Sequence, residues 1–208
     1  MRLFIAVVVS ILLCPSVSNA AECSFSENKT DPFSKDSFVK TKWQLLADWN
    51  DSSRNQGKGV DFSIDVQAET DGDRDFLVLK MKLKDGSLYA PNSTNMRNAV
   101  TVRQGDLLKI TLMDKSVVEL PAEKTVWAPT RAKSEGNHYI YRASFDVRYL
   151  LDSDAAAALI RQNTRVIHMI ATQSGHEFFD DRAPLEFDVK DKNQREIKRA
   201  VRCLSQIT

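Results

Sequence analysis

The densest group of potential metal ligands in the chain lies in a short segment, residues 174–181. The segment reads Ser-Gly-His-Glu-Phe-Phe-Asp-Asp, which brings one imidazole and three carboxylates together. A further histidine precedes it in an apolar run. Borderline divalent cations such as zinc take nitrogen and oxygen ligands, and the bound cation can activate water for hydrolysis. The sequence therefore predicts a candidate metal centre made of His168, His176, Glu177, Asp180 and Asp181.

The spacing within this segment differs from that of a zinc-protease helix. Such a helix has a second histidine four positions after the first, and Asp180 stands at that position after His176. The simpler interpretation is a polar loop with charged turn residues, with His168 as a core histidine whose hydrogen bonds are satisfied. No other motif assigns a catalytic residue, since the chain has no nucleophile elbow, Gly-rich phosphate loop or Cys-x-x-Cys pair.

Alternating carboxylates at Asp71, Asp73 and Asp75 form a second candidate site, in this case for calcium. Calcium binds several oxygen ligands, and Glu69 lies close by in the sequence. An EF-hand loop has glycine at its sixth position and glutamate at its twelfth, where this chain has phenylalanine and lysine. An acidic hairpin turn is therefore the expected structure.

The C-terminal segment has the pattern of an amphipathic helix with a basic outer face. Apolar residues recur there at i, i+3, i+4 and i+7, namely at Ile197, Ala200, Val201 and Leu204. The opposite face carries a basic strip of Arg195, Lys198, Arg199 and Arg202. Such a strip is suited to an anionic surface or an acidic partner. Solvated charge, neutralised by nearby aspartates, is the alternative interpretation.

The three tryptophans offer a possible platform for a sugar or a peptide, because exposed tryptophan is enriched at recognition sites. Trp43, Trp49 and Trp127 each lie in a partly apolar stretch of sequence. Core packing is therefore the expected role of all three.

Residues 1–20 have the pattern of a secretory signal peptide. A short basic start precedes an apolar run over residues 3–13, and residues 18–20, Ser-Asn-Ala, supply the small side chains needed for cleavage. The apolar run is shorter than the roughly 20 residues of a membrane span. Cys14 follows a leucine, whereas a lipidation site needs a small residue there. We expect cleavage after Ala20 and export to the periplasm or the medium, with no membrane span.

The two cysteines of the predicted mature chain, residues 21–208, lie near its opposite ends. In an oxidising compartment Cys23 and Cys203 are expected to form a disulfide. Because Cys203 flanks the apolar stripe of the C-terminal helix, the bridge should dock that helix against the N-terminal segment. The length of the mature chain suits one domain.

Acidic and basic residues are nearly equal in number, so the chain as a whole has no strong electrostatic field of either sign. The chain has 29 basic and 28 acidic residues, so nothing draws it as a whole to nucleic acid or to an anionic membrane. No cofactor is predicted, and the expected partner is a protein or an extracytoplasmic ligand of unknown identity.

Strict alternation of apolar and polar residues predicts several short strands joined by turns. The clearest are residues 60–66, 76–83, 107–113, 117–120 and 139–147, and a continuous apolar run predicts one more at 166–171. The chain around Asp31-Pro32-Phe33 is expected to be extended, and residues 43–49 fit either a strand or a short helix.

A helix over residues 155–161 follows the central strands. Asp152 or Ser153 can cap its start, and Asn163 suits the left-handed position after its end. With the C-terminal helix, the pattern predicts a mainly β domain, a β-sandwich or open barrel of antiparallel hairpins with two helices. The favoured function is an exported, soluble, disulfide-tied, non-enzymatic binding or structural module. The alternative is a metal-assisted hydrolase that uses the histidine and carboxylate cluster described above.

Overall fold

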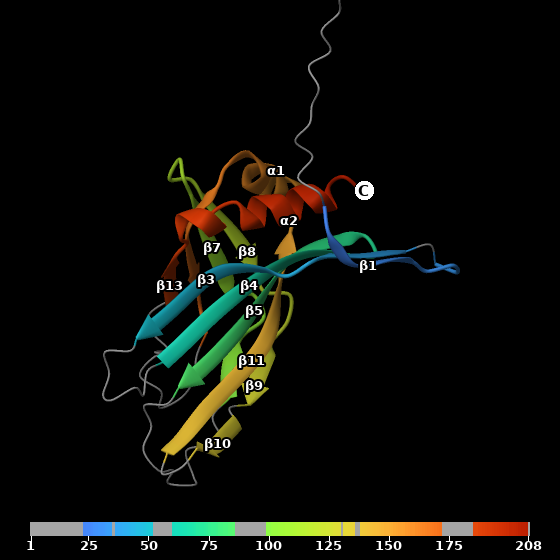
Figure 1. Cartoon of the computed structure of the whole chain (residues 1–208). Helices are drawn as coiled ribbons and strands as arrows, with labels where there is room; N and C mark the ends of the chain where they lie inside the picture. The colour runs from blue at the N-terminus through green and yellow to red at the C-terminus, as the bar shows by residue number, and fades with distance from the viewer. Residues whose placement is uncertain are drawn as a thin grey trace, which may run out of the picture.

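The computed structural model describes residues 23–34, 36–51, 60–85, 99–129, 131–135, 138–171 and 185–207. Its elements are antiparallel β-strands and two α-helices, one in the middle of the chain and one near the C-terminus (Figure 1). The prediction of a mainly β fold with two helices is therefore confirmed.

The largest sheet is built around two long strands that pair along their whole length. In spatial order its path is β1 (Phe25–Thr30), β2 (Ser37–Thr41), β4 (Val60–Asp71), β5 (Arg74–Asp85), β11 (His138–Leu151) and β10 (Arg131–Glu135). The early part of β4 pairs with β3 (Gln44–Asp51), and its last residues pair with β2. One strand thus holds two neighbours along the same edge.

The described residues also form two smaller sheets. The four-stranded sheet has the order β13 (Leu185–Asp188), β12 (Thr164–Met169), β7 (Leu107–Leu112) and β8 (Val117–Pro121). The two-stranded sheet pairs β6 (Ala99–Val102) with β9 (Val126–Pro129).

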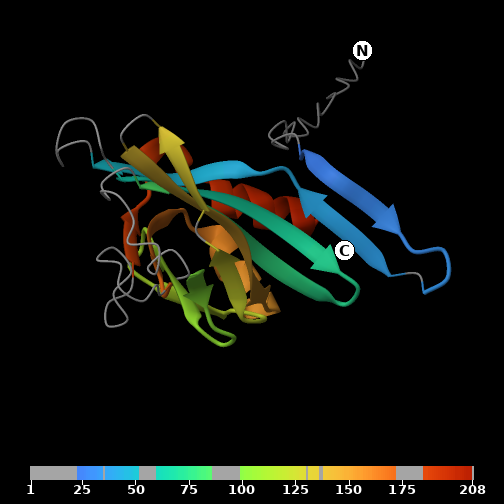
Figure 2. The same cartoon turned by 90° about the horizontal axis from the view of Figure 1, so that it is seen from below.

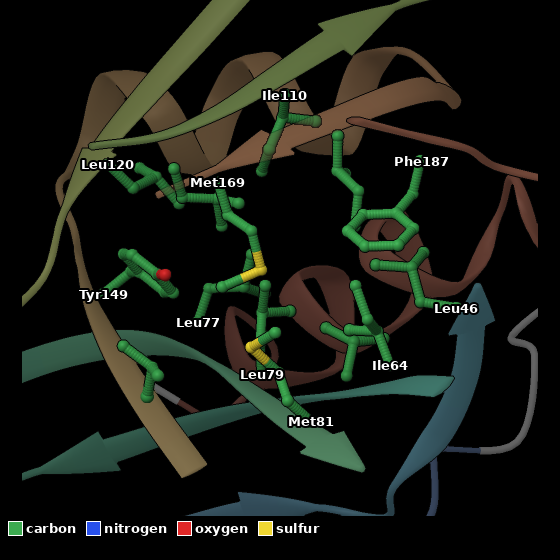
Figure 3. Close-up of a cluster of buried hydrophobic side chains, with 14 of the residues drawn as sticks. Leu46, Ile64, Leu77, Leu79, Met81, Ile110, Leu120, Tyr149, Met169 and Phe187 are labelled. Carbon is green, nitrogen blue, oxygen red and sulfur yellow. The ribbon is translucent and has the colours of Figure 1, made fainter. Parts of the chain in front are cut away.

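The core lies between the two larger sheets. Figure 3 shows Ile64, Leu79 and Met81 pointing from the large sheet toward Ile110 and Met169 of the four-stranded sheet. All of these side chains are fully buried. The alternation of apolar residues along each strand explains this arrangement, because successive side chains of a strand point to opposite faces.

The two helices lie together at one end of the sheets (Figure 1). Helix α1 (Ser153–Arg161) begins at Asp152, whose carboxylate accepts a hydrogen bond from the Ala155 amide at 2.8 Å. Of the two predicted caps, Asp152 is therefore the one used. Helix α2 (Glu196–Leu204) follows a short 3₁₀ turn, η2 (Asp191–Asn193), and buries the predicted apolar stripe.

The structure differs from the sequence-based expectation at two places and decides between the alternatives at a third. The left-handed position predicted for Asn163 is wrong: Gln162 is already extended (φ −119°, ψ 157°), because the chain passes directly from α1 into β12. The expectation of an extended chain at Asp31-Pro32-Phe33 is also wrong, since the Asp31 carboxylate accepts hydrogen bonds from the Phe33 and Ser34 amides and forms a turn. Residues 44–51 form a strand.

The β1–β2 hairpin extends beyond the rest of the large sheet (Figure 2). Its far end is the turn that presents Phe33, whose side chain is exposed. Its near end begins beside Cys23, which ties the hairpin to α2.

Candidate functional site

The predicted disulfide is present and joins the start of β1 to α2. Cys23 and Cys203 are bonded, with their Cα atoms 5.4 Å apart. Next to the bridge a small apolar cluster of Phe25, Val39, Ala68, Ala200 and Leu204 packs α2 onto β1, β2 and β4. The bridge therefore docks the C-terminal helix against the N-terminal segment, as the sequence predicts.

The basic strip of α2 lies on the side of the helix away from the core. Arg195, Arg199 and Arg202 are exposed. Lys198 is half-buried and turns toward α1, where its Nζ donates to the Arg161 carbonyl at 3.1 Å. We call the exposed arginines together with Lys198 the basic face.

Few carboxylates compensate the basic face. Glu196 pairs with Arg199 at 3.4 Å, and no other acidic side chain in the described part of the chain pairs with any member of the face. The aspartates expected to neutralise it do not do so where they are described: Asp191 accepts from Gln194, and Asp188 is exposed. Asp180 and Asp181 lie outside the described residues.

A small pocket adjoins the disulfide, between α2, the end of β2 and the start of β3. We call it the bridge pocket, and its volume is about 200 Å³. It is lined by Ser24, Thr41, Lys42, Gln44, Arg199, Ala200 and Cys203. Sequence reasoning missed this pocket because Lys42 carries no motif and only the fold brings it beside Arg199.

His168 is the one member of the predicted metal centre within the described residues. It lies on β12 opposite Glu186 of β13, with its Nδ1 3.6 Å from the Glu186 carboxylate, and its side chain is 28% exposed. The expectation of a core position is therefore wrong: the neighbours Ile167 and Met169 face the core, and alternation turns His168 to the other side. His176, Glu177, Asp180 and Asp181 lie in 172–184, outside the described residues.

The acidic segment at residues 71–75 is a tight hairpin turn between β4 and β5. Gly72 takes a left-handed conformation there (φ 67°), which glycine adopts without strain. Asp71 pairs with Arg148 at 2.9 Å, and Asp75 accepts a hydrogen bond from Thr70 at 2.7 Å. These carboxylates are thus engaged with the protein itself.

The tryptophans do not share one role. Trp43 is half-buried, and the Lys80 ammonium lies 4.0 Å from the centre of its ring. The expected core position of Trp127 is wrong, because its side chain is 73% exposed. Its neighbours Val126 and Ala128 pack against the core, so alternation along β9 directs Trp127 outward. The side chain of Trp49 lies outside the described part.

A second charged group, missed by sequence reasoning, is centred on Arg148 of β11. Its guanidinium pairs with Glu69 at 2.5 Å, with Asp71 at 2.9 Å and with Glu123 at 3.3 Å. Arg74 also reaches Glu123, at 3.4 Å. We call these five residues the Arg148 cluster. It ties β4, β5 and β11 to the connection that follows β8.

Glu69 is the most perturbed carboxyl of this cluster. Burial raises the pKa of Glu69 above its ordinary value, and the positive charge of Arg148 offsets this only in part. Perturbed groups gather at functional sites, but structural ion pairs also perturb them. Because Arg148 pairs with three carboxylates from different parts of the chain, we interpret the cluster as structural.

Two broader features of the described residues bear on function. They contain no group of three histidine, cysteine or carboxylate side chains placed to hold a metal ion. Within the same ranges, neither helix has the length and apolar character needed to cross a membrane.

Comparisons with known proteins identify no relative. The chain matches no protein-family model, no curated protein and no solved structure.

Proposed function

We propose that this chain is an exported, non-enzymatic binding module that engages an anionic ligand through the basic face of α2. Export is supported by the signal-peptide pattern of residues 1–20 and by a disulfide, which persists in oxidising compartments. The destination is the periplasm or the medium.

The observation that carries the proposal is the exposed and largely uncompensated charge of α2. Three exposed arginines lie on α2 or at its N-cap, and Glu196 alone pairs with any of them among the described residues. Arginine is suited to carboxylate and phosphate groups because its planar guanidinium presents several donors at once. The chain is nearly neutral overall, so this local surface, and not a global field, would select an anionic ligand.

The helix is also held firmly enough to act as a binding surface. Ile197 and Val201 are buried in the main core, and Ala200 and Leu204 pack on the large sheet. The disulfide fixes the end of the same helix. A rigid surface loses less conformational entropy when it binds, which favours affinity.

Chromatography on immobilised heparin, a polyanion, tests the proposal. Reversing two charges in an Arg195→Glu, Arg202→Glu variant should lower the affinity about tenfold, because two attractions become repulsions in a surface interaction that salt screens. The matched control is Arg103→Glu, Lys124→Glu, which makes the same charge change at exposed positions away from α2. Equal loss in both variants would show that net charge, and not the basic face, governs binding.

The alternative function is a metal-assisted hydrolase. Its support within the described residues is the pair of His168 and Glu186, which offers a nitrogen and an oxygen ligand 3.6 Å apart on neighbouring strands. The other ligands would come from residues 176–181. Metal titration, argued in the Discussion, separates this function from the binding module.

A further inference from the structure

The bridge pocket combines two cationic side chains with small polar groups in a confined space. Lys42 comes from the link between β2 and β3, and Arg199 comes from α2. Ser24 and Gln44 line the same space. The Lys42 amide donates a hydrogen bond to the Ser24 carbonyl at 2.9 Å, which fixes the spacing of two of its walls.

The donors of the pocket fit an oxyanion better than any other small group. An ammonium offers three donors and a guanidinium five, while a serine hydroxyl and a glutamine amide add more. The hydroxyl of Thr41 is not one of them, because it donates to the Ala68 carbonyl at 3.3 Å. The described residues that line the pocket include no carboxylate, so a bound anion would meet no like charge from its walls.

Neither Lys42 nor Arg199 has a strong carboxylate partner among the described residues that would compete with a bound anion. Arg199 is 50% exposed and pairs with Glu196 through one nitrogen at 3.4 Å, which is a long contact for a guanidinium. No carboxylate of the described chain pairs with the Lys42 side chain, which is exposed at the rim of the pocket. Both groups therefore keep donors for a ligand.

The size of the pocket limits what it can take. Pockets for drug-sized ligands span about 300–1,000 Å³, and this one is about 200 Å³. One small charged group fits, and the remainder of a larger ligand would lie along the basic face.

From these observations we infer that the bridge pocket binds a phosphate or sulfate group, held between Lys42 and Arg199. The inference deepens the proposed function, on which it rests, because it names the chemical group that the basic face recognises. A tetrahedral oxyanion can accept a bidentate pair of hydrogen bonds from the Arg199 guanidinium and a further hydrogen bond from the Lys42 ammonium. The disulfide contributes by holding Ser24 next to α2.

Titration of the isotope-labelled protein with inorganic phosphate, followed by amide NMR, tests this inference. Sodium chloride at equal ionic strength provides the reference. Phosphate should shift the amide signals of Ser24, Lys42 and Arg199, and Lys42→Met and Arg199→Met should each weaken the binding about tenfold. The matched controls Lys124→Met and Arg165→Met remove one charge each at exposed positions outside the pocket and should change the affinity less than about twofold.

The possible outcomes separate this inference from the proposed function. The inference would be overturned if phosphate caused no specific shifts at the pocket, or if the control variants weakened phosphate binding equally. In that case, loss of heparin binding in the Arg195→Glu, Arg202→Glu variant would still support the proposed function of the basic face. Sedimentation with phosphatidylglycerol vesicles, compared with phosphatidylcholine vesicles, identifies the source of the group. Lys42-dependent binding to the anionic vesicles supports the inference with a lipid headgroup as the ligand, and binding of free phosphate alone supports it with a soluble ligand.

Discussion

The guanidinium of Arg148 lies 3.8 Å from the centre of the Phe76 ring, and Phe76 is fully buried beneath it. Phe76 is on the face of β5 opposite to the core residues Leu77 and Leu79. An aromatic ring on that face would meet water without a cover. Arg148 supplies part of the cover with its flat, weakly hydrated group, and the surrounding carboxylates hold it in place.

Replacing Arg148 by methionine tests this arrangement. An Arg148→Met side chain still covers part of the ring but leaves Glu69 and Glu123 without their shared cation. We expect the free energy of unfolding in urea to fall by about 2–4 kcal/mol, since breaking a buried ion pair leaves a charge uncompensated. Arg165→Met, at an exposed position, should change it by less than about 0.5 kcal/mol. A loss no larger than that of the control would contradict a structural role for the cluster.

The raised pKa of Glu69 predicts a specific dependence of stability on pH. The folded protein holds the Glu69 proton more tightly than the unfolded chain, whose ordinary pKa is near 4.5. The stabilisation from this proton is therefore complete below about pH 4.5 and is lost as the pH rises through the folded-state pKa.

The stability of the Glu69→Gln variant tests the direction of this pH dependence, because the glutamine amide imitates the protonated carboxyl. At pH 7 the variant should be more stable than the wild type by up to about 1 kcal/mol, because the buried charge is gone and the amide oxygen can still accept from Arg148. Below about pH 4 the two proteins should be equally stable. Urea unfolding across this range provides the measurement, and a variant that is less stable at pH 7 would show that the ion pair outweighs burial.

The sequence predicts the strands well because alternation acts locally. Each residue from 61 to 66 faces the core or the outside according to its own type, so the pattern is visible without knowing the neighbouring strands. The same pattern fails for Trp127. Its exposure depends on which face of β9 is covered, and only the assembled sheets decide that.

The Arg148 cluster and the bridge pocket could not be predicted from the sequence, because each is formed by residues that lie far apart along the chain. Val78 pairs with Gln67 on one side and with Arg148 on the other, and this register brings Arg148 next to Glu69. Likewise Lys42 and Arg199 meet only because the disulfide and the apolar stripe dock α2. Contacts of such long sequence separation leave no periodic signal, since they depend on pairing between distant strands and helices.

The hydrogen bond at the start of α1 predicts that substitutions at Asp152 and at Ser153 have different effects on stability. The Asp152 carboxylate accepts from the Ala155 amide at 2.8 Å, and loss of such a cap costs about 1 kcal/mol. Asp152→Ala should lower the free energy of unfolding by that amount. Ser153→Ala should leave it nearly unchanged, because Ser153 is the first residue of the helix and caps nothing. Similar losses in both variants would show that the two side chains share the cap.

Metal addition distinguishes the binding module from the hydrolase. For the module we expect the melting temperature to be the same with chelator and with zinc, manganese or calcium. A site that binds a metal only in the folded protein must instead raise the melting temperature as the metal saturates it. An increase with zinc that disappears in both His168→Ala and His176→Ala would contradict the non-enzymatic proposal and favour the hydrolase. Glu186→Gln then reports whether the neighbour of His168 takes part.

Removal of the disulfide should weaken both the fold and the bridge pocket. Cys23 and Cys203 are 180 positions apart, and in the chain-entropy model closing so long a loop stabilises the folded state by up to about 5 kcal/mol. The Cys23→Ser, Cys203→Ser variant should therefore unfold at lower urea concentration. It should also bind phosphate more weakly at concentrations where it is still folded, because Ser24 is no longer held against α2. Dithiothreitol should reproduce both effects in the wild type and change nothing in the variant. Titration of two free thiols in the untreated protein would contradict the bridge, while lost stability with unchanged phosphate affinity would show that the pocket forms without it.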